Sequence, residues 1–326
     1  MAKKIKLLIT GANGYIGNCL FNFLKKKFDV FGIDCKNTFN KEILKCNLLS
    51  KKKLDKILLK IKPDVVIHLA AQSLVDETIN KKKYYENNIL ASNILINLMK
   101  KNNIKKILFS STASIYKKDI KPLKENSKLQ PLSYYAKTKL ICENNIKKEK
   151  KLKSIILRFF NVCSALNKPI LGELHNPETH LIPTVVYKSL KKEKIYIYGK
   201  NFDTFDGTCV RDYIHIKDVC LAIEKSIRFL FKNKESLLLN IGNSRGYSNQ
   251  EIVNFVEQKL NKKIDIKFVR KRKGDVSSLI CNSDKARSLL SWRSGNSNIK
   301  NIIQNEISWI KKLDKMQIKR KFKTYL

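Results

Sequence analysis

The sequence lacks any apolar run of the ~20 residues that a helix needs to cross a bilayer. It also lacks a cleavable N-terminal signal, because the first residues up to Lys6 lead directly into the strand-like Leu7-Leu8-Ile9. Internal repeats and low-complexity linkers are absent as well. The 326 residues are 43% hydrophobic, which excludes global disorder and predicts a packed core. We therefore expect a cytoplasmic protein without membrane segments.

Acidic residues and arginine are scarce. The chain has 28 Asp and Glu against 67 Lys and Arg, a net charge of +39, yet only nine of the basic residues are Arg. Proteins that read nucleic acids favour Arg, whose planar guanidinium matches guanine and phosphate. The lysines here are spread over every segment, so we interpret them as solvated surface and expect no specific nucleic-acid partner.

The eight cysteines include no C-x-x-C pair, and the four histidines are scattered along the chain. The spacing typical of zinc ligands is therefore missing. We expect reduced thiols and no metal.

What the sequence does contain is an alternation of strand-like and helical segments. Short apolar runs that resemble buried parallel strands occur at 5–9, 30–34, 65–69, 107–111 and 155–159. Amphipathic stretches such as 79–101 and 135–150 lie between them. This alternation predicts an α/β protein with a Rossmann-like, doubly wound parallel sheet.

The pattern changes after Asn161. Loops that contain Pro and Gly precede shorter, mixed elements, of which a helix over 249–260 is the clearest. We expect a first domain over 1–161 and a smaller, mixed region over 162–326, with residues 210–245 returning to the first domain.

A glycine-rich turn, GANGYIG at 11–17, directly follows the first strand and opens a helix. Glycines let the backbone turn sharply and approach a pyrophosphate, to which the helix N-terminus offers N–H donors. Asp34 ends the second strand, where a carboxylate would bond the ribose hydroxyls of a dinucleotide. That carboxylate would repel a 2′-phosphate, which favours NAD over NADP, although Lys36 weakens the discrimination. The simpler alternative is a structural turn beside a solvated acid.

A Y-x-x-x-K spacing occurs at Tyr135 and Lys139. Residues four apart share a helix face, and a nearby ammonium lowers the pKa of a phenol toward values useful for proton transfer. The spacing alone is weak evidence, because it also occurs at Tyr187/Lys191, Tyr196/Lys200 and Tyr213/Lys217. Context favours the first pair, which follows Ser110-Ser111-Thr112 at the end of the fourth expected strand, where open α/β sheets place their ligands. We predict that Tyr135 is the acid and base.

These motifs resemble the extended short-chain dehydrogenase/reductase family, and within it the UDP-glucose 4-epimerase branch, over nearly the whole chain. The general signatures are the glycine turn, VVIHLAA at 65–71, YYENN at 84–88 and YAKTK at 135–139. The segments close to diagnostic for the branch are HNPETHLIP at 175–183 and DGTCVRDYIH at 206–215, preceded by LRFFN at 157–161.

The resemblance implies an NAD-dependent enzyme that interconverts UDP-galactose and UDP-glucose, with a homodimer as the expected assembly. Tyr135 would take the proton of the sugar C4 hydroxyl while hydride passes to NAD, and the 4-keto sugar would rotate and be reduced on its other face. Lys139 would hold the nicotinamide ribose and tune Tyr135, and Thr112 would bond the C4 oxygen. The first domain would bind NAD, and residues 162–326 would mainly bind the UDP-sugar.

The resemblance also assigns contacts by position. The expected cofactor-binding residues are Gly11, Gly14, Tyr15, Ile16, Gly17, Asp34, Asn47, Leu48, Leu69, Ala70, Ala71, Asn87, Lys139 and Phe160. The expected substrate-binding residues are Thr112, Tyr135, Asn161, His180, Leu181, Tyr196, Tyr198, Arg211, Arg272, Asp275 and Leu279. Asn161, Arg211 and Arg272 would meet the diphosphate, since a guanidinium forks onto two oxygens. Asp275 would accept from the uridine ribose, and the uracil would lie among Leu181, Tyr196 and Tyr198.

Several of these residues allow other interpretations. Arg211 could instead form a buried ion pair with Asp212, and His68 is more simply a packed histidine at a strand end. His180 could contact the nucleotide through its backbone or its side chain. The segment between Asp34 and Asn47 is short for the family, and Ser73 stands where some members have Lys.

Rival functions are open on the sequence alone. Sugar-nucleotide dehydratases and UDP-glucuronate decarboxylases share the expected fold, but a dehydratase needs a carboxylic acid after the strand-end hydroxyl, where Ala113 and Ser114 stand. Leu279 is intermediate in bulk at the position that would gate an N-acetyl group, so UDP-N-acetylhexosamines remain candidate substrates. A catalytically silent NAD-binding regulator is the alternative from another class.

Overall fold

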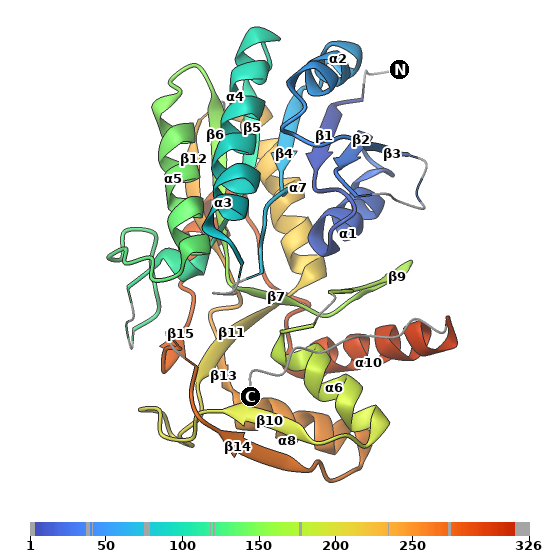
Figure 1. The fold of residues 1–326 in the computed structure, drawn as a ribbon, viewed down its shortest axis with the longest axis vertical. Helices are drawn as coiled ribbons and strands as arrows, with labels where there is room; N and C mark the ends of the chain where they lie inside the picture. Colours follow the sequence, from blue (N-terminus) through green and yellow to red (C-terminus); the bar gives the residue numbers. More distant parts are fainter. Residues whose placement is uncertain are drawn as a thin grey trace.

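A parallel sheet of seven strands is the centre of the larger part of the computed structural model (Figure 1). In their order across the sheet the strands are β12 (Leu237–Ile241), β6 (Lys153–Phe159), β5 (Lys106–Thr112), β4 (Val65–His68), β1 (Lys6–Thr10), β2 (Asp29–Asp34) and β3 (Ile43–Lys45). The structure describes residues 4–36, 40, 42–74, 79–117, 119, 121–175, 178–233, 235–272 and 275–316. The strand order reverses at β1, which lies between β2 and β4, so the predicted doubly wound sheet is confirmed.

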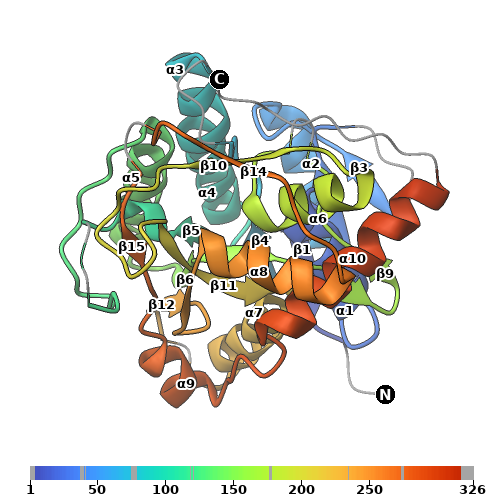
Figure 2. The same ribbon diagram turned by 90° about the horizontal axis from the view of Figure 1, so that it is seen from below.

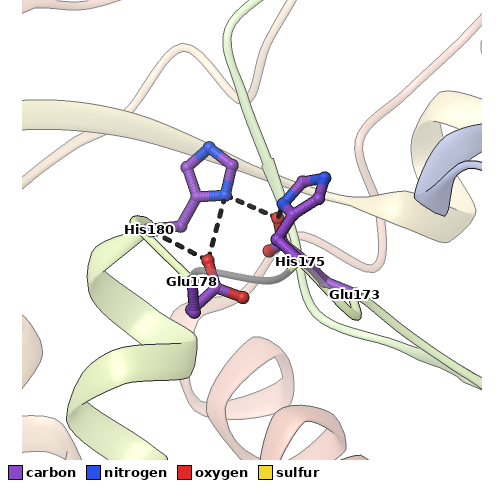
Figure 3. Close-up of side chains that lie close together, drawn as sticks. All are labelled: Glu173, His175, Glu178 and His180. Atoms are coloured by element: carbon purple, nitrogen blue, oxygen red, sulfur yellow. Dashed lines mark hydrogen bonds and ion pairs between the residues drawn. The ribbon is translucent and has the colours of Figure 1, made fainter. Parts of the chain in front are cut away.

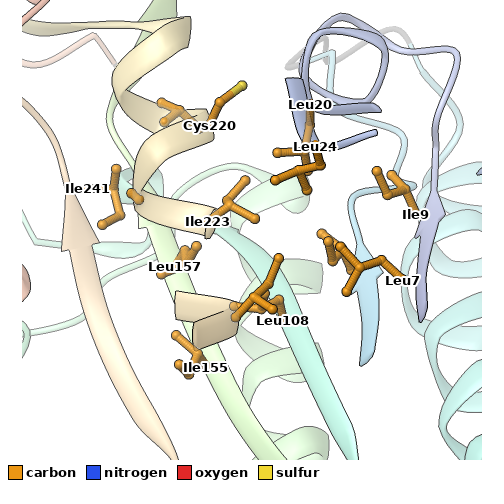
Figure 4. Packing of buried hydrophobic residues seen from close by; sticks show 14 of the residues in the cluster. Leu7, Ile9, Leu20, Leu24, Leu108, Ile155, Leu157, Cys220, Ile223 and Ile241 are labelled. Atoms are coloured by element: carbon orange, nitrogen blue, oxygen red, sulfur yellow. The ribbon is translucent and has the colours of Figure 1, made fainter. Parts of the chain in front are cut away.

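Helices cover both faces of this sheet because its strands are apolar on both sides. Leu7 and Ile9 of β1 point into one core, and Leu8 between them points into the other. The first core is closed by α1 (Tyr15–Leu24) and α7 (Ile216–Lys232), as Figure 4 shows. The second core is closed by α2 (Lys51–Ile61), α4 (Ala91–Lys101) and α5 (Tyr134–Lys148).

The expected helix over 79–101 is interrupted by a wider turn. It consists of α3 (Lys81–Tyr84), a π-helical turn over Tyr85–Leu90 and then α4. The buried amide of Asn88 lies on this turn, donates to Thr138 Oγ1 at 2.8 Å and accepts from the backbone N–H of Gln72 at 2.7 Å. The turn therefore connects the loop after β4 to α5, which periodicity alone does not reveal.

A second, smaller region follows β6 and lies below the sheet in Figure 1, and Figure 2 views the molecule from that side. One of its sheets contains β7 (Asn161–Cys163), β11 (Val210–His215), β13 (Gly246–Ser248) and β15 (Ser278–Leu279), and another pairs β10 (Ile195–Tyr198) with β14 (Ile266–Val269). The short strands β8 (Leu166–Asn167) and β9 (Ile170–Leu171) pair with each other. Around its core pack α6 (Leu181–Lys191), α8 (Asn249–Leu260) and α10 (Ile299–Lys315).

The chain returns to the first sheet late in the sequence. α7 and β12 belong to that sheet and its core, whereas β11, just before α7, belongs to the smaller region. α9 (Asp284–Leu290) and Trp292 also pack into the first core. Among the described residues, every helix is too short or too polar to traverse a lipid bilayer.

A buried ion pair anchors α5 to the sheet. The side chains of Glu143 on α5 and Arg158 on β6 are 0% and 1% exposed, and two hydrogen bonds of 3.0 and 2.7 Å join them. Ser111 Oγ on β5 donates to the same carboxylate at 2.5 Å, and Arg158 Nη1 donates to the hydroxyl of Tyr116 at 2.8 Å. One carboxylate thus joins three elements that the site below requires.

We expect the substitution Glu143→Gln to lower the free energy of unfolding by about 3–5 kcal/mol, because it leaves the buried guanidinium of Arg158 without its counter-charge. The matched control is Glu149→Gln at the end of the same helix, whose partly exposed pair with Lys100 should be worth less than about 1 kcal/mol. Urea denaturation measures both. Equal losses in the two variants would show that the buried pair does not anchor the helix.

Candidate active site

The glycine turn after β1 is packed too closely for side chains. Gly11 has a φ of +69°, and a Cβ there would lie 2.8 Å from the backbone of Ala70. A Cβ on Gly17 would lie 2.1 Å from the carbonyl oxygen of Gly11. α1 begins at Tyr15 directly behind this turn, so its first N–H groups point toward the carboxyl edge of the sheet. The turn is a cradle of the kind that holds a phosphate.

Asp34 is held beside the same turn. Its Oδ2 accepts from the backbone N–H of Asn13 at 3.0 Å and its Oδ1 from that of Lys36 at 2.9 Å. The backbone N–H of Cys46 donates to the Asp34 carbonyl at 2.7 Å, which brings the following Asn47 and the buried Leu48 next to it. The residues expected on the adenosine side therefore meet in space, although they are well separated in the sequence.

The loop after β4 lies against the glycine turn. Leu69 donates its N–H to the Thr10 carbonyl at 3.2 Å, and Ala70 donates to Thr10 Oγ1 at 3.3 Å, so both residues and Ala71 line this edge. The hydroxyl of Tyr15 donates to the Ser164 carbonyl at 2.6 Å, which gives that side chain a structural partner.

The remaining expected cofactor residues are more dispersed. Ile16 packs against the first core, and Asn87 lies on the π-helical turn next to Asn88. Phe160 is buried in a small cluster with Ala136 and Leu279, which lies between α5 and β15.

The three residues expected to carry the chemistry come together at the end of β5. Ser133 caps α5 by accepting from the Ala136 N–H, so the helix begins at Tyr134 and Tyr135 lies in its first turn. The hydroxyl groups of Tyr135 and Thr112 are hydrogen bonded. Lys139 is 3% exposed and donates to the Ser110 carbonyl at 2.6 Å, with its ammonium 4.7 Å from the centre of the Phe109 ring.

Burial disfavours the charged forms of both members of the Tyr–Lys pair. Desolvation raises the pKa of Tyr135 to about 12, although the hydrogen bond with Thr112 lowers it. Desolvation also lowers the pKa of Lys139 to about 8. The Lys139 ammonium is directed to the Ser110 carbonyl, so the expected lowering of the phenol pKa by Lys139 stays a prediction.

Two expected diphosphate ligands lie on neighbouring strands of the smaller region. Arg211 Nη1 donates to the Val276 carbonyl at 2.8 Å, and its Nη2 lies 3.9 Å from the carboxylate of Asp275. Leu279 pairs with Arg211 in the register of β11 and β15. Asn161 Nδ2 donates to the Asp212 carbonyl at 3.0 Å.

The alternative ion pair between Arg211 and Asp212 is not what the structure shows. The buried Asp212 carboxylate accepts from the backbone N–H groups of Asn243, Ser244 and Cys281 at 2.7–3.1 Å. Desolvation raises the pKa of this carboxyl group to about 7, against the opposing effect of these amides. Asp212 therefore joins β11 to the loops beyond β12 and β15.

The residues expected around the uracil lie on α6 and β10. Tyr196 and Tyr198 share one half-exposed face of β10, because the alternate residues Ile195 and Ile197 point into the core. The guanidinium of Arg272 lies 4.0 Å from the centre of the Tyr198 ring. Leu181 is the first residue of α6, and His180 precedes it.

The two histidines considered in the sequence, His68 and His180, have different surroundings. His68 is fully buried between Thr10 and Ser92, and burial lowers its pKa to about 3, as expected for a packed histidine. His180 instead lies with Glu173, His175 and Glu178 in a group that the sequence did not reveal, because its spacing differs from the usual zinc motifs.

Two residues that position α5 were not predicted from the sequence. Asn88 and Glu143 hold α5 in place, but neither stands out in a single sequence. The i,i+4 spacing of Lys139 and Glu143 was a usable signal, since it places both on one face of α5.

Some positions of the sequence motifs lie outside the described residues, namely Asn37, Thr38, Asn176, Pro177, Lys273 and Gly274.

Fold and site together assign the chain to a class. The model of the NAD dependent epimerase/dehydratase family matches residues 7–242, and the chain belongs to this family. The resemblance inferred from the motifs is confirmed at this level.

Individual proteins and structures similar to this chain carry more specific names than the family does. The UDP-glucose 4-epimerase of Rhizobium meliloti (strain 1021) is 34% identical over 300 residues, which are 88% of this chain and 91% of that protein. The structure of UDP-glucose 4-epimerase from Brucella ovis in complex with NAD is 28% identical, with a TM-score of 0.89 over 94% of this chain and 98% of that one. The UDP-Glc/GlcNAc 4-epimerase from Campylobacter jejuni is 29% identical, with a TM-score of 0.80 over 94% and 99%.

The glycine turn yields a matched pair of variants. Gly17→Ala should lower the free energy of unfolding by ~3 kcal/mol and weaken nucleotide binding, because its Cβ would collide with backbone. Gly14→Ala should cost less than about 1 kcal/mol, since its Cβ would lie 3.3 Å from the same Gly11 carbonyl oxygen. Urea denaturation and the nucleotide content of the purified proteins measure the difference. Equal free energies of unfolding and equal nucleotide contents in the two variants would contradict the close packing of the glycine turn at Gly17.

The low pKa of Lys139 predicts a pH-dependent stability for the protein freed of nucleotide. Below pH 8 the native state holds Lys139 as a buried ammonium, which lowers the free energy of unfolding. Between pH 8 and about 10 the native state has lost this proton while the unfolded chain still binds it, so the free energy of unfolding rises with pH. Lys139→Met should therefore be more stable than the parent by roughly 2 kcal/mol at pH 7, and the gap should shrink as the pH rises to 10. The neighbouring exposed lysine supplies the control, Lys137→Met. A gap that does not change with pH would contradict the assignment.

Proposed function

We propose that this protein interconverts UDP-galactose and UDP-glucose by NAD-dependent epimerisation at C4. The observation that carries the proposal is the meeting of Thr112, Tyr135 and the buried Lys139 at the carboxyl end of β5, on the same edge of the sheet as the glycine turn. A proton-transfer group beside a dinucleotide cradle is what reversible oxidation of an alcohol requires.

The residues present fit NAD. The turn from Gly11 to Gly17 is too tightly packed for a Cβ on Gly11 or Gly17, and this sharp turn would let the first N–H groups of α1 approach a pyrophosphate. Asp34 presents a carboxylate at the end of β2, which suits two ribose hydroxyls and disfavours a 2′-phosphate. Lys139 would hold the nicotinamide ribose. When bound, NAD supplies the acceptor and later the donor of the hydride at the sugar C4.

The side chains then have separable roles. Thr112 holds the C4 oxygen, and Tyr135 takes the proton of the C4 hydroxyl and returns it when the other face of the 4-keto sugar is reduced. A phenol whose pKa is near 12 is a poor base at neutral pH. Lys139 would supply the positive charge that lowers this pKa.

The substrate contacts depend on the placement of the charged residues. Arg211, Arg272 and Asn161 hold the diphosphate, and Asp275, 3.9 Å from Arg211, accepts from the uridine ribose. Leu181, Tyr196 and Tyr198 flank the uracil, with His180 at the start of α6. The substrate domain is accordingly the region from residue 162 onward, without the returning α7 and β12.

Elimination chemistry is disfavoured by the residues directly after β5. Ala113 is buried and Ser114 donates its N–H to Thr112 Oγ1, so no carboxylic acid stands next to the strand-end hydroxyl. UDP-N-acetylhexosamines are a second candidate substrate class, since the Campylobacter jejuni relative is a UDP-Glc/GlcNAc 4-epimerase. Leu279, a side chain of intermediate bulk, stands at the position expected to gate the N-acetyl group.

Cytoplasmic location and a homodimeric assembly complete the proposal. All eight cysteines are free thiols, as in proteins of reducing compartments. The homodimer rests on the family resemblance alone, and analytical ultracentrifugation would test it.

The central test measures UDP-glucose formation from UDP-galactose in an assay coupled to UDP-glucose dehydrogenase. Tyr135→Phe should lose activity by ~10²–10⁴-fold while keeping its fold and its NAD, because only the transferable proton is removed. Tyr134→Phe is the matched control, since that ring packs edge-on against Tyr84 and should keep near-parental activity. UDP-N-acetylgalactosamine in parallel reports on the second candidate.

Two results would contradict the proposal. Absence of conversion by folded, NAD-containing protein would favour a silent NAD-binding regulator. Unchanged activity of Tyr135→Phe would remove Tyr135 from the chemistry.

A further inference from the structure

Two carboxylates and two imidazoles converge between β9 and α6. They belong to Glu173, His175, Glu178 and His180, which we call the Glu/His cluster (Figure 3). One ligand atom from each side chain, a ring nitrogen or a carboxylate oxygen, lies within 4.8 Å of each of the other three. The epimerisation proposed above uses only His180 of this group, so the convergence needs a separate explanation.

The ligand atoms point toward a common centre. His180 Nδ1 lies 2.5 Å from Glu173 Oε1 and 3.5 Å from Glu178 Oε1, and His175 Nδ1 also contacts Glu173 Oε1. The Nε2 atoms of both rings point away from this centre (Figure 3). Each imidazole therefore offers one nitrogen to the cluster and keeps the other for outside partners.

The surrounding backbone holds the carboxylates in place. Glu178 Oε1 accepts from the N–H groups of Thr179 and His180 at 2.8 and 2.9 Å, and Trp309 Nε1 on α10 donates to the Glu173 carbonyl at 2.6 Å. The Glu173 and Glu178 side chains are 1% and 0% exposed, while those of His175 and His180 are 38% and 51% exposed. The buried part is thus preformed, and the exposed imidazoles leave an entrance from solvent.

We propose that the Glu/His cluster binds one divalent ion of the zinc class. Imidazole nitrogen combined with carboxylate oxygen suits zinc and its neighbours, whereas magnesium and calcium prefer oxygen alone. Ligand atoms about 2.0–2.2 Å from a tetrahedral zinc lie about 3.3–3.6 Å from one another, and His180 Nδ1 lies 3.5 Å from Glu178 Oε1. The shorter contacts to Glu173 must widen, which the half-exposed His175 permits. The ion would balance two buried carboxylates and tie the loop after β9 to the start of α6.

The competing explanation needs no metal. Two protonated imidazoles could balance the same two carboxylates, and the cluster would then be a network of charged hydrogen bonds. The two explanations differ in zinc stoichiometry and in the visible spectrum of a cobalt-substituted protein, neither of which involves nucleotide or sugar. The test is therefore independent of the epimerase assay, and either proposal can fail alone.

The experiment uses the full chain without an affinity tag, freed of metal with a chelator and dialysed. Zinc is titrated in against a competing indicator, and bound zinc is counted by mass spectrometry. We expect one equivalent per chain, a cobalt spectrum of four-coordinate intensity and a higher melting temperature with zinc. His175→Ala and Glu178→Gln should each weaken binding by at least ~10-fold, judged on variants that remain folded by circular dichroism.

Two control variants make the result specific. Glu193→Gln removes an exposed carboxylate at the far end of α6, and Cys35→Ser removes the exposed thiol; neither should change zinc affinity. Absence of stoichiometric binding would overturn the proposal in favour of protonated imidazoles. Equal affinity in His175→Ala, or loss of binding in Cys35→Ser, would place the ion elsewhere and overturn it as well.

Discussion

The placement of the chemistry depends on one buried carboxylate. Glu143 accepts from Ser111 on β5 and from Arg158 on β6, and it lies one helical turn beyond Lys139 on the same face of α5. Because a charge buried without partners is costly, this pair stabilises the observed position of the helix along the sheet. That position brings Tyr135 to Thr112 and Lys139 to the Ser110 carbonyl. The geometry of the site therefore depends on a packing constraint within the protein itself.

The parallel sheet supplies the rest of the arrangement. Its strands all end at one edge, so the glycine turn after β1, the loop after β4 and the hydroxyls after β5 face the same space. Burial at this edge favours the neutral forms of both Tyr135 and Lys139. A phenol in that state needs a positive charge nearby before it can act as a base at neutral pH. The smaller region completes the edge with Arg211 and Arg272.

The sequence predicted much of this fold. The five expected strands and the helices 135–150 and 249–260 agree with the structure within two residues at either end. β3 and the π-helical turn were not predicted, since three residues are too few for a periodicity and the turn keeps a helical pattern. Among the four Tyr–Lys spacings, context selected the pair whose ammonium is buried. Lys191, by contrast, pairs with Asp314 at the surface.

Local features were decided by the sequence itself. Glycines in a sharp turn and short apolar runs act over a few residues, so GANGYIG and the strands can be predicted directly from the sequence. The tertiary structure decided the partners: Glu143 with Arg158, Arg211 with Asp275, and the inward orientation of the Glu/His cluster. Periodicity tells which face of an element is buried, but the side chain that it meets depends on how distant segments pack, and that is set by the whole core at once.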